Sequence, residues 1–344
     1  MEHFDLQEVD SLEAMVIIDN ELDPLSLPAP ETVELSGNLV TIAMSAGHVP
    51  TDRGGAYREV RMEDICCSAH GLSILVTATK GDKKHSVLFD AGPEEDIWER
   101  NVKRLRPDLA SVEVIQLSHW HRDHSGGLGK AIRMIKEAKQ TQGISDELVV
   151  DVHPDRPVYR GIALPELIIS LEADPTFEEL SSAGATVDKR SDAHLVLDDM
   201  FLISGEIPRV TPYEVGLRNA VRFDPEEKDW YSDEVIADER FLAVNLKDKG
   251  LVVFTGCSHA GVVNTTKHAV DLVSPRTLLH AVVGGFHLAM SEEAQINNTV
   301  SDLKRLDPAV LMPGHCSGWR SKFAIEKAMP GTLVPCTVGL KITF

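Results

Sequence analysis

The chain has 344 residues, enough for one large domain or two ordinary ones with a sizeable core. Its 54 acidic residues outnumber its 34 Lys and Arg residues, and the formal net charge is −20. That charge argues against a nucleic-acid partner and against an anionic membrane surface. With 43% hydrophobic and 26% charged residues, the composition is typical of a soluble globular protein.

Hydropathy and cysteine usage bear on the cellular compartment. No apolar run reaches the roughly 18 residues that a membrane-spanning helix needs. The first residues, MEHFDLQEVD, are acidic and lack the layout of a secretory signal. The five cysteines, an odd number, show no disulfide-framework spacing. We therefore expect a reduced, cytoplasmic protein.

The first part of the chain is predicted to form strands, a hairpin and two helices. Alternation and β-branched residues predict strands, and proline in a first turn favours a helix start. We expect strands over 13–19, 39–45 and 112–117, an irregular loop over 20–37, a hairpin from 73–78 and 85–89, and helices over 93–105 and 128–138.

The second part is predicted to alternate strands with helices. The segments 156–190 and 211–240 have no clear period and are expected to cover a site or face a substrate. We expect strands over 148–152, 278–283 and 309–312, two short strands within 193–204, a hairpin from 241–246 and 250–254, helices over 262–272 and 291–306, and an edge strand within 334–344.

One loop, SHWHRDHSGG over 118–127, concentrates side chains that bind metals. It holds His119, His121, Asp123 and His124 between a predicted strand and a predicted helix. Only 14 of the 344 residues are histidine, so this density is improbable by chance. Imidazole and carboxylate ligands suit zinc, iron or manganese. The loop therefore predicts a metal site.

Other predicted strands also end in a loop that carries His or Asp. If these strands point one way in a layered fold, their ends meet at one edge. Asp90 could orient a ligand histidine or close an Asx turn. His153 is a further ligand candidate, because it also follows a predicted strand. The five predicted strand ends carry Asp90, the 119–124 cluster, His259, His287 and His315.

The HxHxDH motif and the later histidines resemble the metallo-β-lactamase-fold hydrolase superfamily. Asp90-Ala91-Gly92, SHWHRDHSGG, SGEIPR, TGCSHAG, GGFHL and PGHC together resemble its dihydropterin–ribofuranosylaminobenzene phosphate synthase-like branch. The resemblance spans roughly residues 36–344. It implies a four-layer αββα sandwich with a metal site at one edge. The resulting domain prediction is one domain over 36–344, to which the strand and loop of 1–35 belong, with 156–240 partly an insertion or cap.

The resemblance also implies a ligand set for two divalent ions, zinc first and manganese or iron as alternatives. His119 and His121 would bind the first ion, and Asp123, His124 and His315 the second. The sequence departs from the usual pattern at two places. Gly205-Glu206 stands where a further histidine is usual, and Cys257 stands where a bridging aspartate is usual. His259 is expected to supply the missing ligand; Cys257 and Glu206 remain open alternatives.

Two adjacent cations lower the pKa of a shared water and polarise the oxygen under attack. Asp123 would then orient the nucleophile and accept its proton. His287 would donate a proton to the leaving group, or is simply a hydrogen-bonded core histidine. Arg209 and Lys83 are candidates for holding a substrate phosphate or carboxylate.

Three functions follow for this site. The first is a binuclear metal-dependent hydrolase of a small ester, lactone, lactam or phosphoester. The second is a metal-dependent synthase that couples pterin-like and aryl-ribose-phosphate fragments, as the name of the branch suggests. The third is a metal-binding or redox module without hydrolytic activity. We favour the hydrolase, because every residue of HxHxDH is present and no flavin domain is visible.

Overall fold

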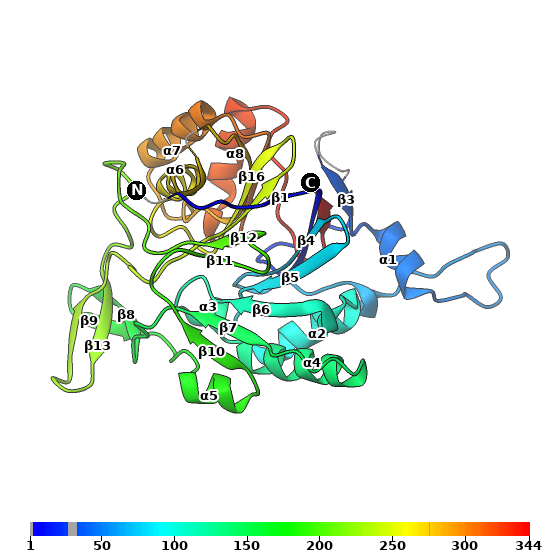
Figure 1. Ribbon diagram of the computed structural model, residues 1–344. Coiled ribbons are helices and arrows are strands. Elements are labelled where there is room, and N and C mark those ends of the chain that lie inside the picture. The colour runs from blue at the N-terminus through cyan, green and yellow to red at the C-terminus, as the bar shows by residue number, and fades with distance from the viewer. Residues whose placement is uncertain (1–2, 27–32, 275) are drawn as a thin grey trace.

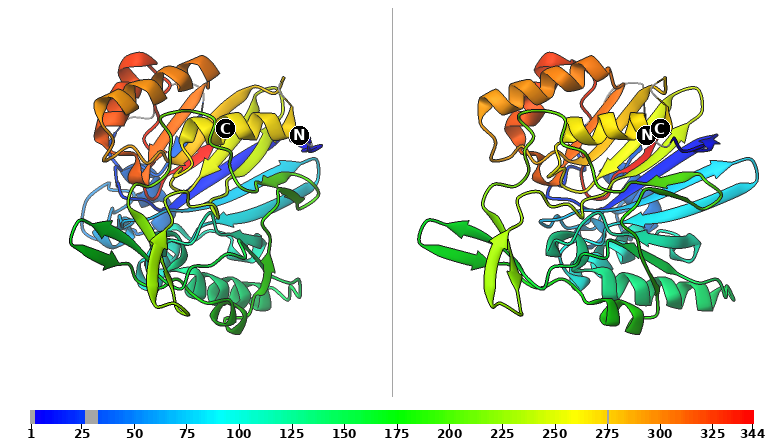
Figure 2. Two further views of the ribbon diagram at one scale, coloured as in Figure 1. Left: turned by 90° about the vertical axis from the view of Figure 1, so that its left-hand side faces the viewer. Right: turned by 60° about the vertical axis from the view of Figure 1, so that its left-hand side comes forward.

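The computed structural model describes residues 3–26, 33–274 and 276–344. Two large sheets lie face to face, and helices cover the outer face of each (Figure 1). These four layers are the predicted αββα sandwich. A third, smaller sheet projects from one side of the molecule (Figure 2).

The first large sheet has eight strands in the order β10-β7-β6-β5-β4-β2-β19-β3. The hairpin β4–β5 is antiparallel, whereas β5, β6 and β7 run parallel, so their carboxyl ends lie at one edge. The strands are β2 (Ser11–Ile18), β3 (Glu34–Ser36), β4 (Ser73–Lys80), β5 (Lys83–Phe89), β6 (Val112–Gln116), β7 (Val149–Val152), β10 (Thr186–Lys189) and β19 (Lys341–Thr343).

The second large sheet has the order β11-β12-β15-β16-β17-β18, and β1 pairs with β15. The predicted hairpin β15–β16 is antiparallel, and β16, β17 and β18 run parallel. The strands are β1 (Glu8–Val9), β11 (His194–Val196), β12 (Phe201–Ile203), β15 (Leu242–Leu246), β16 (Gly250–Thr255), β17 (Leu279–Gly285) and β18 (Val310–Gly314).

Three apolar clusters hold the layers together. One lies between the two sheets, and the other two lie between a sheet and its helices. In α4 (Leu128–Thr141) the buried residues include Leu128, Ala131, Ile132 and Ile135, the spacing of one helix face. The first sheet is covered by α2 (Glu95–Leu105), α4 and α5 (Phe177–Ser182), and the second by α6 (Val262–Val273), α7 (Glu293–Leu306) and α8 (Trp319–Ala328). Among the described residues, no helix is both long and apolar enough to cross a bilayer.

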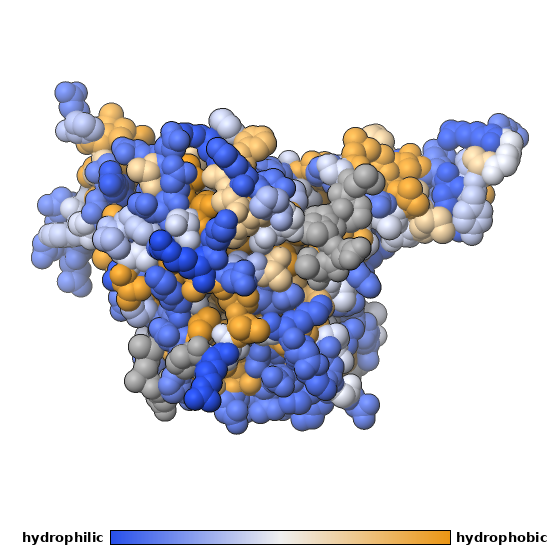
Figure 3. Space-filling view, turned by 90° about the horizontal axis from the view of Figure 1, so that it is seen from above, coloured by the Kyte–Doolittle hydropathy of each residue, from blue (hydrophilic) through white to orange (hydrophobic). Residues whose placement is uncertain are grey.

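The strand predicted over 39–45 is wrong, because Leu39–Ala46 forms the helix α1. The Asn38 side chain accepts a hydrogen bond from the Thr41 N–H, and Gly47 ends the helix in the left-handed region. These caps favour a helix more strongly than the β-branched residues of the segment favour a strand. Val40 and Met44 on this helix are exposed, and Figure 3 shows hydrophobic side chains where the segment leaves the body and polar ones toward its tip.

Three other predictions need correction. The C-terminal strand β19 is not an edge strand, since it pairs with β2 on one side and β3 on the other. The predicted 20–37 loop is wrong at its end, where Glu34–Ser36 forms β3, and its residues 27–32 lie outside the described residues. The predicted loop over 211–240 contains a hairpin, β13 (Ala220–Asp224) with β14 (Asp229–Ser232), which joins β8 (Arg160–Leu164) and β9 (Leu167–Ser170) in the small sheet. Helix α8 was not predicted.

Trp98 tests the packing of α2 on the first sheet. Its side chain is fully buried, and its indole N–H donates to the Ser73 hydroxyl. We expect Trp98→Ala to lower the free energy of unfolding by about 3–5 kcal/mol, because it leaves a large cavity. Trp319→Ala, at a side chain that is 67% exposed, should change it by only about 0.5 kcal/mol. Urea unfolding followed by circular dichroism measures both, and equal effects would contradict this packing.

Candidate metal centre

Loops that follow strands of both sheets meet at one rim of the sandwich. Asp90 follows β5, the 118–127 loop follows β6, Cys257 and His259 follow β16, His287 follows β17, and His315 follows β18. Contacts of His124 with Cys257 and of His121 with His259 join the loops of the first sheet to those of the second. The six predicted ligand residues, His119, His121, Asp123, His124, His259 and His315, all lie in this region and fall into two groups of donor atoms.

The first group consists of His119, His121 and His259. The His119 Nε2 atom is 2.9 Å from His121 Nδ1, which is 3.2 Å from His259 Nε2. All three rings are buried, and burial lowers their pKa values, that of His121 to about 3. The imidazoles are therefore neutral near pH 7. Neutral imidazole nitrogens that converge on one point are suited to hold a cation.

The second group consists of Asp123, His124, Cys257 and His315. The Cys257 Sγ atom is 3.2 Å from Nε2 of His124 and 3.2 Å from Nε2 of His315. An Asp123 carboxylate oxygen lies 3.2 Å from the same His315 nitrogen. The two groups adjoin, because the His119 and His124 rings lie 4.5 Å apart.

The surroundings of the second group favour positive charge. Burial raises the pKa of Asp123, but His124 and His315 outweigh it and hold the pKa well below the usual value. Burial likewise opposes protonation of His124, but Asp123 and Asp90 raise its pKa to about 9. The carboxylate of Asp123 thus stays ionised, and its charge favours a cation beside it, either the protonated His124 or a metal ion that takes the place of that proton.

The Asp90 carboxylate supports both groups. One oxygen accepts from the Ser118 N–H at 2.7 Å, and the other accepts from the Ser118 hydroxyl and from His124 Nδ1, each at 2.7 Å. The Ser118 hydroxyl also lies 2.9 Å from His119 Nδ1. Of the two alternatives for Asp90, the structure favours the first, because the carboxylate orients His124, a predicted ligand.

A buried ion pair holds the 118–127 loop from the side of residues 156–240. Arg160 donates to Asp238 and to the Trp120 carbonyl, and Asp238 accepts from the Trp120 N–H at 2.8 Å. Trp120 lies between two of the histidines of the first group, so this pair fixes their backbone. Glu239 similarly accepts from the His259 and Ala260 N–H groups.

Sequence reasoning missed a set of residues that contact the second group. Asp19 accepts from the His315 N–H, and His315 Nδ1 lies 2.9 Å from Asn20 Oδ1. The side chain of His70 is 70% exposed, and its Nε2 atom lies 3.4 Å from an Asp123 oxygen. His70 precedes β4 rather than following a strand, so the pattern of a strand followed by His could not identify it.

His287 belongs to a third group, with Cys257 and Cys316. Its ring lies 4.4 Å from the His259 ring. Burial opposes protonation of His287, but a contact with the Cys316 thiol outweighs it and raises the pKa. This position fits a proton donor beside the first group, as well as a hydrogen-bonded core histidine.

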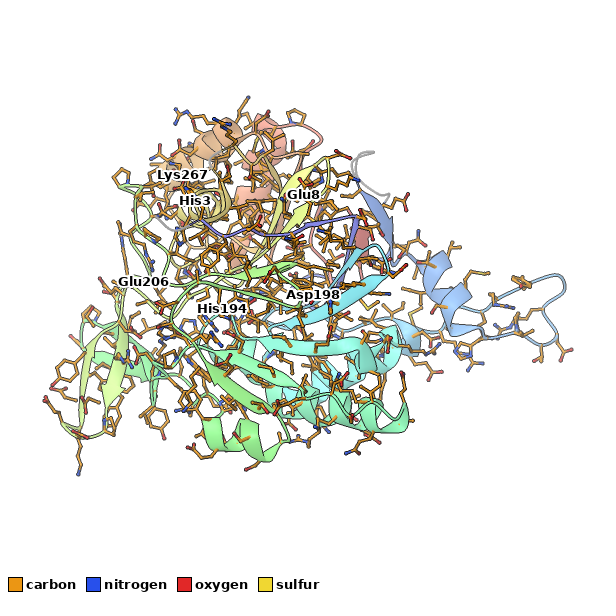
Figure 4. The ribbon with its side chains drawn as sticks, viewed as in Figure 1. His3, Glu8, His194, Asp198, Glu206 and Lys267 are labelled. Carbon is orange, nitrogen blue, oxygen red and sulfur yellow. The ribbon has the colours of Figure 1, made fainter. Side chains whose placement is uncertain are left out.

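The other predicted candidates lie outside these groups. Lys83 is at the start of β5, the opposite end from Asp90, and pairs at 2.6 Å with Asp198, which is labelled in Figure 4. Arg209 donates to the backbone carbonyls of Ile207 and Val235. His153 Nδ1 accepts from the Asp155 N–H, and Glu206 is exposed at one side of the molecule. The structure thus places none of Lys83, Arg209, His153 or Glu206 with the ligand groups.

The donor atoms fit a pair of divalent ions. The first group offers three neutral imidazoles, and the second adds a carboxylate, two imidazoles and a thiol. In addition, His259 Nδ1 is buried and has no hydrogen-bond partner. Nitrogen, oxygen and sulfur ligands of this kind suit zinc and iron.

Asp90→Asn tests whether the Asp90 carboxylate orients His124 in the second group. The new amide N–H atoms would face the N–H at His124 Nδ1, so the contact that orients His124 is lost, while the Ser118 hydroxyl can accept from the amide. We expect metal affinity to fall about 10- to 100-fold. Competition with a chromogenic chelator measures the affinity. Asp198→Asn, at an exposed pair far from the site, is the control, and equal affinities in the two variants would refute the role of Asp90.

Asp238→Asn tests the buried ion pair. Although burial raises the pKa of Asp238, Arg160 outweighs it and lowers the pKa to about 2. We expect a loss of up to about 3 kcal/mol in the free energy of unfolding near pH 7, because the buried Arg160 then keeps only Asp233 as a carboxylate partner.

The pH dependence of that loss has a definite sign. Because the folded pKa lies below the ordinary 3.8, the ionised Asp238 stabilises the fold above about pH 4 and ceases to do so as the pH falls toward about 2. The gap between wild type and Asp238→Asn should narrow over that range in urea unfolding. An exposed control, Asp146→Asn, should show no such gap at any pH.

Comparisons with known proteins agree with the fold. No protein-family profile matches the chain. A curated protein of Methanocaldococcus jannaschii, named 7,8-dihydropterin-6-methyl-4-(β-D-ribofuranosyl)-aminobenzene-5′-phosphate synthase, is 28% identical over 256 residues, which are 74% of this chain and 83% of that protein. The predicted resemblance to this branch is therefore confirmed.

Two solved structures superpose along almost the whole chain. Tm1679, described as a metal-dependent hydrolase of the β-lactamase superfamily, has a TM-score of 0.65 and 22% identity and covers 96% of this chain and 98% of its own. The metallo-β-lactamase fold protein YhfI of Bacillus subtilis has a TM-score of 0.50 and 11% identity and covers 96% and 99%. Together with the four layers and the two ligand groups, these likenesses show that the chain has the metallo-β-lactamase fold.

Proposed function

We propose that the protein is a binuclear metal-dependent hydrolase of a small ester, lactone, lactam or phosphoester. The observation that carries the proposal is the pair of adjoining ligand groups at the rim, one of three neutral imidazoles and one that includes Asp123. We propose zinc as the ions, with manganese or iron as alternatives. When bound, such ions supply Lewis-acid polarisation of the scissile group and activation of water.

The chain's own residues have distinct tasks in this reaction. Asp123 is ionised and 22% exposed, so its carboxylate can orient a water molecule and accept its proton. His70 stands at the solvent side of Asp123, where its ring can donate a hydrogen bond to a substrate oxygen. His287, beside His259, can donate a proton to the leaving group.

We propose that the segment 156–240 is partly an insertion or cap of a single domain, and that its small sheet of β8, β9, β13 and β14 covers one side of the site. Arg160 and Asp238 tie it to the 118–127 loop, and Arg122 in that loop donates to the Ala173 carbonyl. We propose a small-molecule substrate, in the cytoplasm. The net charge of −20 disfavours a nucleic acid.

A second candidate function is a metal-dependent synthase. The 28% identity to the M. jannaschii protein favours it, because that protein is named for a synthase reaction. The third candidate, a metal-binding module without turnover, is disfavoured because every residue of the HxHxDH motif lies in a ligand group.

A substrate panel separates these functions. We expect hydrolysis of at least one class among p-nitrophenyl esters, phosphodiesters, lactones and lactams. The activity should vanish after chelation and return with added zinc, manganese or iron. Turnover without release of an acid would favour the synthase. Activity that survives complete removal of metal would eliminate both enzymatic functions.

His121→Ala tests the first ligand group directly. Its ring nitrogen lies between those of His119 and His259, so its removal leaves two donors where three converge. We expect metal-dependent turnover to be lost while the circular dichroism spectrum is retained. Exposed His3 gives the control, since His3→Ala should keep both metal content and rate. Unchanged metal content in His121→Ala would refute the assignment.

A further inference from the structure

A segment that we call the arm, residues 39–64, leaves the body of the molecule and extends outward on the right side of Figure 1. It begins with α1 and ends with a short 3-10 helix, Met62–Asp64. Contacts within the arm fix its shape. The Glu59 N–H donates to the His48 carbonyl, and the His48 ring lies 3.0 Å from the Asp64 carboxylate. The outgoing and returning halves of the arm are therefore held together.

The arm exposes large apolar side chains along its length. Val40 is 70% exposed and Met44 is 50% exposed, and they lie four residues apart on one face of α1. Beyond the helix, Tyr57 is 67% exposed, and Val49 and Met62 are also exposed. A single apolar side chain on a surface is ordinary, whereas a series of them on one projection marks an interaction site.

Helix α1 lacks the packing that usually stabilises so short a helix. It has eight residues, of which only Ala43 is buried. Isolated helices shorter than about 12–15 residues are marginal in water, and in proteins their stability comes mainly from packing of an apolar face. The Asn38 and Gly47 caps stabilise the two ends of α1 but leave Val40 and Met44 uncovered. A second surface over this face would supply the missing packing.

A recess of about 430 Å³ lies at the base of the arm, between α1 and the body. Its surface is mainly apolar, and the apolar lining residues are Met15, Leu22, Val40, Met44, Leu105 and Val338. The molecule thus carries a projection with exposed apolar side chains and, at the base of that projection, a recess of the same character.

We propose that the arm joins two copies of this chain, with the outer half of each arm lying over α1 and the recess of the other. A two-fold axis through the middle of the two arms produces this arrangement, because it brings the same surface of each copy together and reverses the direction of one arm. Tyr57 in the outer half of one arm then lies beside Met44 at the base of the other.

The size of the arm fits a second copy. A standard interface takes about 20–30 residues from each partner. The arm, residues 39–64, is of this length, so a pair of arms with their recesses suffices for a stable dimer. Because the arm already has a fixed shape, association does not have to order it.

The charge of the arm also fits a second copy. Two copies of a chain with a net charge of −20 repel each other, so a contact between them must avoid acidic surfaces. The arm is nearly neutral. Its three arginines stand against four acids: Arg53, Arg58 and Arg61 against Asp52, Glu59, Glu63 and Asp64.

Sedimentation equilibrium of the full chain tests the proposal. We expect dimers at micromolar concentration. Met44→Glu and Tyr57→Glu should each weaken association at least about 30-fold, because each places a carboxylate in an apolar contact. Phe323→Glu is the matched control and should stay dimeric, since Phe323 is 69% exposed but lies on α8, outside the arm. Circular dichroism checks that all three variants are folded.

A mixture of two variants tests the direction of the arms. In a mixed dimer of Met44→Glu with Tyr57→Lys, the new carboxylate meets the new ammonium at one contact, and the other contact keeps its natural residues. In a dimer of either variant alone, both contacts are disrupted. We therefore expect the mixture to form dimers at concentrations where each variant alone is monomeric.

Several outcomes would overturn the proposal. A chain that stays monomeric would leave the recess to a small ligand or to another protein. Dimers that persist in both arm variants, or that dissociate in Phe323→Glu instead, would place the interface elsewhere. A mixture no more associated than its components would exclude the reversed arrangement of the arms. These readouts need neither metal nor turnover, so the inference stands or falls independently of the proposed function.

Discussion

The buried carboxylate of Asp90 is the contact on which the site depends. It lies at the end of β5 and accepts three hydrogen bonds from the loop after β6, one of them from His124. Because β5 and β6 are parallel neighbours, their ends lie side by side, and the carboxylate joins them. The ring of His124 is then aimed at Cys257, which comes from the other sheet. One fixed acceptor thus aligns residues from both halves of the sandwich.

The same rim carries backbone strain. Asp90, Ser258, His287 and His315 all have positive φ, between 46° and 60°, although none is glycine. Such conformations cost about 1–3 kcal/mol each and persist only where the surroundings enforce them. Here the apolar cluster between the two sheets supplies that force. The sharp turns point side chains into the rim at the ends of strands. The packing of the apolar cluster between the sheets therefore offsets the conformational cost of placing these side chains.

The sequence was sufficient for what local patterns encode. Alternating apolar residues predicted both large hairpins, and the density of histidine after 117 predicted the metal groups. The sequence was insufficient where contacts between residues far apart in the chain determine the structure. The segment 39–46 became a helix through its Asn38 and Gly47 caps, and β19 found two partners far away along the chain. His70 reaches the site from a loop before a strand, and Arg160 meets Asp238 across 78 residues. Such pairings have no local signature.

The ion pair between Arg160 and Asp238 links recognition to the metal groups. Arg160 begins β8 of the small sheet, and both partners contact the backbone of Trp120, between His119 and His121. A substrate that displaces the small sheet must therefore move this pair or strain it. Since a buried charge cannot be left without its partner at low cost, the sheet and the loop move together. The segment that we propose as a cover of the site is thereby joined by hydrogen bonds to the loop of the residues that would hold the ions.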